Sequence, residues 1–326
     1  MRLVWKATEG AGNTLVSSDR ALPDGHLRAE ALDWLGPAIG VAGAPLRVER
    51  MSGSTSSSLF RIESLRGEIP ERFVLRVLDN RKWLADEPDL AAHEAAALDE
   101  AQRASLPAPR LVAYADDDVG FGAPVVLMSF LDGSVDLRPA DFRGWLRGLA
   151  GQLAAIHQHP ADDFPWRFRS WVNRAALVTP AWSAVPRLWE RAIEFWLGTE
   201  PKSRAVFIHR DYHPTNILWR EGKVSGVVDW INATRGPAGV DVAHCRTNLA
   251  GMYGPAAADE FMTAYRAAAD GFTYDPYWDL DSLLDTCLTG PSYYPPWQEF
   301  GLGAIPPQAL RQRADAYLES VMRLIA

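Results

Sequence analysis

The separation of two hydrophobic patterns along the 326-residue chain constrains its fold most strongly. Apolar runs of the extended, strand-like type occur in the first part, at 46–51, 59–62, 73–78 and 124–130. Beyond residue 131, apolar residues recur at helical spacing, in faces at 145–156, 185–196, 261–268 and 310–324. Strands segregated from helices are typical of an α+β protein. We therefore expect two lobes, 1–131 with strands plus a helix and 132–326 mostly helical.

Within the first lobe, the sequence predicts helices at 31–39 and 90–101, the second ended by Pro107 and Pro109. Residues 1–22 show little periodicity and suit either a strand with a loop or a loose arm. No internal repeat or low-complexity linker is evident, so the two lobes are expected to pack as one protein.

Composition excludes several classes of protein. The chain is 48% hydrophobic and 23% charged, enough for a full core without disulfides or structural metal. Cys245 and Cys287 lie far apart and, with no secretory signal, favour a reduced cytoplasmic location. No apolar run approaches the roughly 18 residues that a membrane span needs. A formal charge of -8 argues against nucleic-acid binding and is compatible with a cationic small substrate.

One segment carries the chemistry, residues 207–230, which read FIHRDYHPTNILWREGKVSGVVDW. His209-Arg210-Asp211 is followed, five residues after the aspartate, by Asn216, and H-R-D-x-x-x-x-N is the string of the kinase catalytic loop. Apolar runs at 217–219 and 224–228 flank a polar tetrapeptide, which predicts a hairpin. This hairpin is expected to return Asp229 to the side of the loop.

Phosphoryl transfer explains why these side chains should meet, because it depends on positioning and charge neutralisation. A carboxylate must orient the incoming hydroxyl and accept its proton, and Asp211 suits that role. Hard oxygen ligands must hold Mg²⁺ on the phosphates, and Asn216 and Asp229 suit that role. We therefore predict a catalytic Asp211 and a metal site at Asn216 and Asp229.

Plainer interpretations exist for each residue alone. A single aspartate before a turn is usually a cap or a turn former, whereas the ordered set with Pro214 and the hairpin is far more specific. His209 and His213 are interpreted as scaffold residues. A metal site of both histidines would need helical i,i+4 spacing, which Pro214 disfavours.

The segment resembles the aminoglycoside phosphotransferase and choline kinase-like superfamily, small-molecule relatives of protein kinases. The family loop H-G-D-x-H-P-x-N is matched by residues 209–216, with Arg210 in place of glycine. The Asp-Phe-Gly of protein kinases is replaced by Asp229-Trp230-Ile231. The next family segment, G-D-P-x-x-D-L-A, is matched from Gly236, although Pro237 stands where its first aspartate would be. Its second aspartate, matched by Asp241, is implied to brace the loop.

The resemblance implies a bilobal, protein kinase-like fold. Its N-terminal lobe, an antiparallel sheet, would bind the nucleotide, and its helical C-terminal lobe would hold the catalytic loop, the metal site and the acceptor pocket. Arg76 matches the strand base that reaches the phosphates, and Glu94, with Glu87 as a rival, matches its helix partner. The run at 53–58 occupies the position of the phosphate-covering loop, with Ser54 and Thr55 as candidate phosphate contacts.

Further implied nucleotide contacts are Met128 and Phe130, in a strand that resembles the hinge holding the adenine edge. Each of these residues has a plainer interpretation as well. Arg76 could be a solvated strand charge, Glu94 an exposed helix carboxylate, and the hinge an ordinary buried strand.

The implied activity is an O-phosphotransferase that uses Mg²⁺ with ATP, or GTP, and a small hydroxyl acceptor such as an aminoglycoside-like antibiotic, an amino alcohol or a sugar. The aromatic and acidic stretch 274–299 suits an amine or sugar, or else forms core and a solvated face. A catalytically weak relative acting as an interaction protein is the alternative. A protein kinase is disfavoured because no Ala-Pro-Glu segment follows Asp229. No nucleic-acid or membrane partner is expected, and the oligomeric state is left open.

Overall fold

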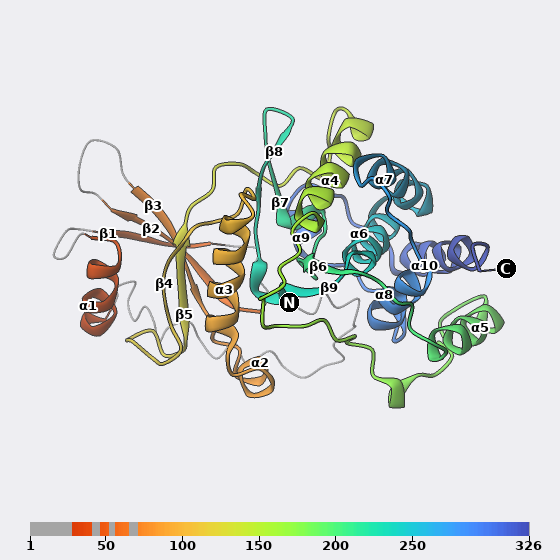
Figure 1. The fold of residues 1–326 in the computed structure, drawn as a ribbon, viewed down its shortest axis with the longest axis horizontal. Helices are drawn as coiled ribbons and strands as arrows, with labels where there is room; N and C mark the ends of the chain where they lie inside the picture. Colours follow the sequence, from red (N-terminus) through yellow and green to blue (C-terminus); the bar gives the residue numbers. More distant parts are fainter. Residues whose placement is uncertain (1–27, 41–45, 52–55, 65–70, 326) are drawn as a thin grey trace. The chain divides into compact units, whose positions relative to one another are not determined.

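The computed structural model describes residues 28–40, 46–51, 56–64 and 71–325, which form two compact units (Figure 1). The first unit contains the described residues up to Asp132 together with Trp230–Asn232, and the second contains Gly133–Asp229 and the residues from Ala233 onward. The chain thus returns to the first unit directly after Asp229. The sequence did not predict this return, and residues 1–22 lie outside the described part.

The first unit is built on an antiparallel sheet, in which the described strands follow the order β1-β2-β3-β5-β4. The strands are β1 (Leu46–Met51), β2 (Ser58–Ser64), β3 (Glu71–Val77), β4 (Leu111–Ala115) and β5 (Val125–Ser129). Four were predicted. The partly exposed β4 was missed because its five residues, LVAYA, carry no clear alternation.

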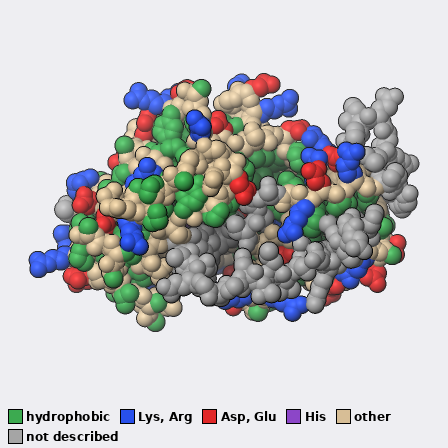
Figure 2. Space-filling view, turned by 180° about the vertical axis from the view of Figure 1, so that it is seen from behind, with side chains coloured by type: hydrophobic (Ala, Val, Ile, Leu, Met, Phe, Trp, Pro, Cys, Tyr) green, Lys and Arg blue, Asp and Glu red, His purple; other side chains and the backbone are tan. Residues whose placement is uncertain are grey.

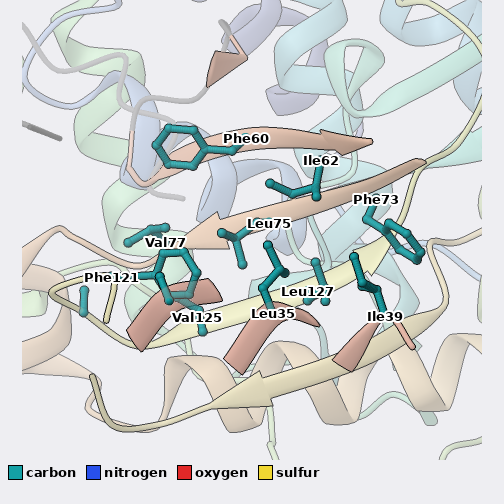
Figure 3. Packing of buried hydrophobic residues seen from close by; sticks show 12 residues of the cluster. Leu35, Ile39, Phe60, Ile62, Phe73, Leu75, Val77, Phe121, Val125 and Leu127 are labelled. Atoms are coloured by element: carbon teal, nitrogen blue, oxygen red, sulfur yellow. The ribbon is translucent and has the colours of Figure 1, made fainter. Parts of the chain in front are cut away.

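Alternation along the strands separates a core face from a functional face. Phe73, Leu75 and Val77 of β3 pack with Leu35 and Ile39, from helix α1 (Ala29–Ala38) and its C-cap. Figure 3 shows these side chains converging from the sheet and the helix. Because successive strand residues point to opposite faces, Arg76 must face the other side of the sheet.

That other side is covered by α3 (Leu90–Arg103), which contacts β4 and β5; Figure 1 shows α1 and α3 on opposite sides of the sheet. The short helix α2 (Arg81–Asp86) precedes α3 and was not predicted. The returning turn Trp230–Asn232 (η5) also contacts α3, and its three side chains are buried. The first unit therefore buries α3 between its sheet and a segment from much later in the chain.

The second unit is mainly helical. Its predicted helices are α4 (Phe142–His157), α5 (Pro186–Leu197), α7 (Pro255–Ala268) and α10 (Pro307–Met322). Three further helices, α6 (Ala238–Tyr253), α8 (Tyr277–Cys287) and α9 (Pro296–Glu299), were not predicted. α6 shows no helical periodicity because nearly all of it is buried, on every face.

Two short strand pairs frame the chemical segment. β6 (Ala205–Ile208) pairs with β9 (Thr234–Pro237), and β7 (Ile217–Arg220) pairs with β8 (Lys223–Val227). The second pair is the predicted hairpin. Glu221 and Gly222 at its tip have φ of 52° and 74°, the left-handed values that a two-residue hairpin turn requires.

The surface is mixed in charge. Figure 2 shows a face on which acidic and basic side chains of the described residues are interspersed, rather than gathered in large patches of one sign. Among the described helices, none is long and apolar enough to cross a bilayer.

Candidate active site

The candidate catalytic loop, residues 209–216, begins where the buried strand β6 ends, and Asp241 near the start of α6 fixes its backbone. The Asp241 carboxylate accepts hydrogen bonds from the N–H groups of His209, at 2.7 Å, and Arg210, at 2.6 Å. Arg210 has a φ of 66°, an uncommon conformation for a residue with a side chain. These two bonds hold the loop in that conformation.

Asp241 is in turn held by two helices. His157 at the end of α4 lies with Nε2 3.1 Å from Asp241 Oδ2, and Tyr265 Oη of α7 lies 2.6 Å from His157 Nδ1. Burial by itself raises the pKa of Asp241, but hydrogen bonds and charge from His157 and His209 outweigh it, so the pKa lies below its usual range. The ionised carboxylate therefore joins α4, α6 and the loop.

Arg210 stands where related loops have glycine, and specific contacts hold its side chain. Its guanidinium lies 3.8 Å from the centre of the Trp171 ring and donates to the Arg169 carbonyl at 2.7 Å. Stacking on an aromatic face and a carbonyl bond stabilise a guanidinium that is almost wholly buried. The segment around Trp171 thus packs against the loop, an arrangement the sequence did not indicate.

His209 connects the loop to the residues that follow β8. Its Nε2 donates to the Val228 carbonyl at 3.0 Å, and its Nδ1 accepts from the Asp211 N–H at 3.3 Å. Burial lowers the pKa of His209, against the attraction of Asp241, Asp211 and Asp229. A neutral ring with one donating and one accepting nitrogen fits both bonds, which is a scaffolding arrangement.

The Asp211 carboxylate is buried and faces two imidazoles. His244 Nε2 of α6 lies 3.2 Å from Asp211 Oδ1, and His213 Nε2 lies 3.5 Å from the same oxygen. Burial alone would raise the pKa of Asp211, but His213 and His244 outweigh it and hold the pKa far below its usual range. Asp211 is therefore an anion poised to accept a hydrogen bond. The sequence did not single out His244, although it lies three residues after Asp241.

Asn216 and Asp229 are brought to the same loop. Asn216 Nδ2 donates to the Asp211 carbonyl at 2.8 Å, so its amide oxygen is directed away from that carbonyl. Val228 N donates to the Asn216 carbonyl at 2.9 Å, which places the next residue, Asp229, beside the loop. An amide oxygen and a carboxylate are a donor set that fits Mg²⁺.

The geometry speaks against a metal site formed by His209 and His213. His209 uses both ring nitrogens within the loop, and His213 Nδ1 lies 2.7 Å from Thr215 Oγ1. Among the described residues, no group of three or more His, Cys, Asp or Glu is arranged to hold a metal.

In the first unit, the predicted pair forms an ion pair. Arg76 Nε lies 3.0 Å from Glu94 Oε2, and both side chains are buried. The same guanidinium donates to Ser57 Oγ at 3.3 Å, so the end of the predicted phosphate-covering loop lies at Arg76. Glu87, the rival, is the C-cap of α2. Ser54 and Thr55 lie outside the described residues.

We expect Arg76→Met to lower the free energy of unfolding by about 3–5 kcal/mol, because it removes the cation from a buried carboxylate. The double variant Arg76→Met/Glu94→Leu should recover most of this loss, since it removes both charges. Urea unfolding measures the effect, and Lys82→Met, which breaks the exposed Lys82–Asp86 pair, serves as control with little change expected. Equal losses in the single and double variants would contradict the prediction.

The two predicted adenine contacts lie on and after β5. Met128 is buried, and its register partner on β3 is Val74, two residues from Arg76, so Met128 and Arg76 share a face of the sheet. The Phe130 N–H donates to the Arg72 carbonyl at 3.1 Å, and the Arg72 guanidinium stacks on the Phe130 ring. That N–H is therefore engaged within the unit.

Comparison with protein families decides which family this is. The model of the phosphotransferase enzyme family matches residues 47–279, more than half of the chain. The chain belongs to this family. A search of curated protein sequences gives no match.

Solved structures share the fold of this phosphotransferase at low sequence identity. A provisionally assigned aminoglycoside phosphotransferase from Ralstonia eutropha is 17% identical with a TM-score of 0.59, and the match covers 90% of this chain and 98% of that one. The macrolide 2′-phosphotransferase MphH from Brachybacterium faecium is 18% identical with a TM-score of 0.55, covering 78% and 88%. A thermostable mutant of aminoglycoside phosphotransferase APH(4)-Ia, in complex with ADP and hygromycin B, is 15% identical with a TM-score of 0.55, covering 89% and 98%.

Two of the acidic residues of 274–299 that could have met an amine, Asp279 and Asp281, are engaged inside the phosphotransferase. Asp279 pairs with Arg246 and accepts from Tyr317 Oη, at 2.6 Å, and it is fully buried. Asp281 accepts from Ser170 Oγ at 2.5 Å and from Trp196 Nε1 at 3.0 Å. Most of the aromatic residues of this stretch are buried, so much of it is core.

One aromatic residue of this stretch lies near the catalytic loop. The Tyr294 ring is 6.4 Å from the His213 ring, centre to centre, and packs edge-on to Trp297. The C-terminal stretch therefore reaches the loop through Tyr294.

We expect Asp281→Asn to stabilise the protein at pH 8 and to have little effect at pH 4. Burial, with weaker repulsion from Asp285, raises the pKa of Asp281 to about 6, against hydrogen bonds from Ser170 and Trp196 and the charge of Arg210. A carboxyl with a raised pKa binds its proton more tightly when folded, so stability is lost as the pH rises from about 4, the unfolded value, through about 6. The loss is about 3 kcal/mol.

Asparagine avoids that loss because it stays neutral, and its one amide oxygen can accept both bonds, which reach the same oxygen of Asp281. Thermal unfolding of both proteins across pH 4–8 measures the difference. If the Asp281→Asn variant is less stable than the wild type by the same amount at both ends of this pH range, this account is refuted.

Proposed function

We propose that this family member is an ATP- or GTP-dependent O-phosphotransferase that moves the γ-phosphoryl group onto a hydroxyl of a small molecule. The observation that carries the proposal is the arrangement of Asp211, Asn216 and Asp229 on one braced loop and the adjoining strand end. The fold of the solved antibiotic phosphotransferases supports it.

In this proposal Asp211 orients the acceptor hydroxyl and takes its proton as the oxygen attacks the phosphorus. An anionic carboxylate can accept that hydrogen bond at once, whereas a protonated one would compete as a donor. His209 and Asp241 keep the loop backbone fixed, so the carboxylate does not have to reorganise during transfer.

We propose that Asn216 and Asp229 would hold Mg²⁺. The bound ion would neutralise charge on the phosphates. The donor set supports magnesium, because it offers two hard oxygen ligands and leaves the other positions to water and phosphate.

In the first unit, Arg76 is proposed to meet the nucleotide phosphates while Glu94 holds its guanidinium. Ser54 and Thr55 are proposed as further phosphate contacts. The adenine edge would be met near Met128 and Phe130. Because the Phe130 N–H is engaged with Arg72, recognition there would use the Phe130 carbonyl.

An acceptor screen tests the proposed function. Purified protein with Mg²⁺ and either ATP or GTP is offered aminoglycosides, macrolides, amino alcohols and sugars, and acceptor-dependent nucleotide consumption is measured, with Asp211→Ala as control. Transfer to at least one hydroxyl acceptor that Asp211→Ala abolishes is the expected result.

The alternative, a nucleotide-binding relative without catalysis, predicts a different outcome of the same screen. Nucleotide would then raise the melting temperature while no acceptor, water included, received phosphate. That result would overturn the proposed activity.

A further inference from the structure

The polar face of α6 beside the catalytic loop contains a residue that no family motif accounts for. Asp241, His244 and Asn248 follow one another at spacings of three and four residues, which places them on the same side of a helix. Asp241 binds the loop backbone, and His244 lies at the Asp211 side chain. One helix thus contacts both the backbone and the carboxylate of the loop.

The atom of His244 that faces the Asp211 carboxylate is the ring nitrogen Nε2. Nε2 lies 3.2 Å from Asp211 Oδ1, an ion-pair contact, and the same nitrogen lies 3.2 Å from Asn248 Nδ2. Because the carboxylate oxygen can only accept, we assign the ring hydrogen to Nε2 facing Asp211, which leaves the His244 carbonyl as the acceptor for the Asn248 amide. Asn248 Nδ2 donates to the His244 carbonyl at 3.0 Å and lies 3.2 Å from Nε2, so the next turn of α6 packs behind the ring. The side chains of Asp211, His244 and Asn248 are all buried.

The other neighbours of the Asp211 carboxylate are less well placed to orient it. His213 Nε2 is 3.5 Å from Oδ1, beyond a good hydrogen bond, and its Nδ1 is engaged at Thr215. The Asn216 amide is 3.3 Å from Oδ2, while its stronger bond goes to the Asp211 carbonyl. His244 therefore makes the shortest side-chain contact to either oxygen among those that the described residues provide.

We propose that His244 is a positioning residue for phosphoryl transfer, whose Nε2–H fixes the orientation of the Asp211 carboxylate toward the acceptor hydroxyl. This inference rests on the proposed function. It assigns His244 no contact with nucleotide or metal, so its loss should affect turnover and leave nucleotide affinity unchanged.

Two amide substitutions test the role of that one nitrogen. The amide nitrogen of glutamine can occupy the place of Nε2, whereas the shorter asparagine reaches only the place of Nδ1. We expect His244→Gln to keep kcat within about fivefold and His244→Asn to lose about 100-fold, because a small misplacement of a catalytic group has an effect of that size. The KM for nucleotide should stay within about twofold in both.

The measurement is formation of nucleoside diphosphate from Mg-ATP and Mg-GTP, first with water as the acceptor and then with any acceptor found in the screen. His159→Leu, which removes another imidazole of the second unit, one that contacts the Phe207 ring, is the matched control and should keep wild-type turnover. Melting temperatures identify variants that fail to fold, and His244→Gln still tests the proposal if His244→Asn does.

The outcomes separate the two proposals. If Asp211→Asn is inactive but His244→Gln and His244→Asn have equal turnover, the role of His244 is overturned. The same holds if these variants raise the KM for nucleotide without lowering kcat. A wild-type protein that forms no nucleoside diphosphate with water or with any acceptor, or an Asp211→Asn variant with full turnover, overturns the proposed function itself.

Discussion

Asp211→Asn is expected to reduce acceptor phosphorylation by about 10³-fold or more, within the range that loss of a general base produces. Asparagine retains the shape of the side chain and an oxygen that can accept from His244, so the loop should keep its conformation. It has no basic oxygen to take the proton of the hydroxyl. The result is measured as acceptor-dependent nucleotide consumption under saturating nucleotide.

Nucleotide affinity is the second measurement for this variant. Asn216 bonds to the backbone carbonyl of Asp211, which the substitution retains, and Asp229 is placed through Val228. The dissociation constant of Mg-nucleotide should therefore change little. Asp163→Asn makes the same change at an exposed carboxylate of the second unit and should have wild-type turnover. Near-normal turnover of Asp211→Asn would remove Asp211 from the role of base.

The elements that the sequence predicted best are those whose two faces differ. β3 alternates a core face with a face carrying Arg76, and α4 and α5 each have one buried stripe, so their periodicity is visible. α6 is buried all round and contains Gly239, Arg246 and Asn248, so neither period nor composition marks it as a helix. Its existence follows from tertiary packing, which a single sequence does not display.

The loop residues could be predicted because chemistry fixes their spacing, whereas their supports could not. Asp211 and Asn216 lie five residues apart in one loop, and the hairpin that returns Asp229 has its own turn signal at Glu221-Gly222. His157 binds Asp241, and Tyr265 binds His157, from helices that are far apart in sequence. Nothing local in the sequence pairs an imidazole at the end of α4 with a phenol on α7.

The Arg210 side chain illustrates the same limit. From the sequence, a glycine position occupied by arginine indicates only a departure from the family pattern. In the structure the guanidinium lies on the Trp171 ring and bonds to the Arg169 carbonyl. These contacts come from a segment some forty residues earlier, so only the folded chain reveals how the Arg210 side chain is accommodated.

Asp241→Asn is expected to lower the free energy of unfolding by about 3 kcal/mol and to reduce turnover, although Asp241 has no part in the chemistry. The carboxylate accepts from the N–H groups of His209 and Arg210 and from His157. Asparagine presents an amide donor to at least one of these donors, which leaves buried groups unsatisfied. With the brace lost, the left-handed Arg210 and the adjoining Asp211 should lose their fixed position.

The pH dependence of that destabilisation distinguishes the brace from a general packing defect. Hydrogen bonds and charge from His157 and His209 hold the pKa of Asp241 below its usual range despite its burial. A lowered carboxyl pKa contributes stability that is present above the unfolded value near pH 4 and is lost as pH falls through the folded value. The stability gap between wild type and Asp241→Asn should therefore be constant from pH 7 to 5 and narrow below pH 4, as measured by urea unfolding. Asp270→Asn, at an exposed carboxylate, should match the stability of the wild type at every pH. If the stability gap of Asp241→Asn persists unchanged into strong acid, then Asp241 contributes through its shape and not through its ionised carboxylate.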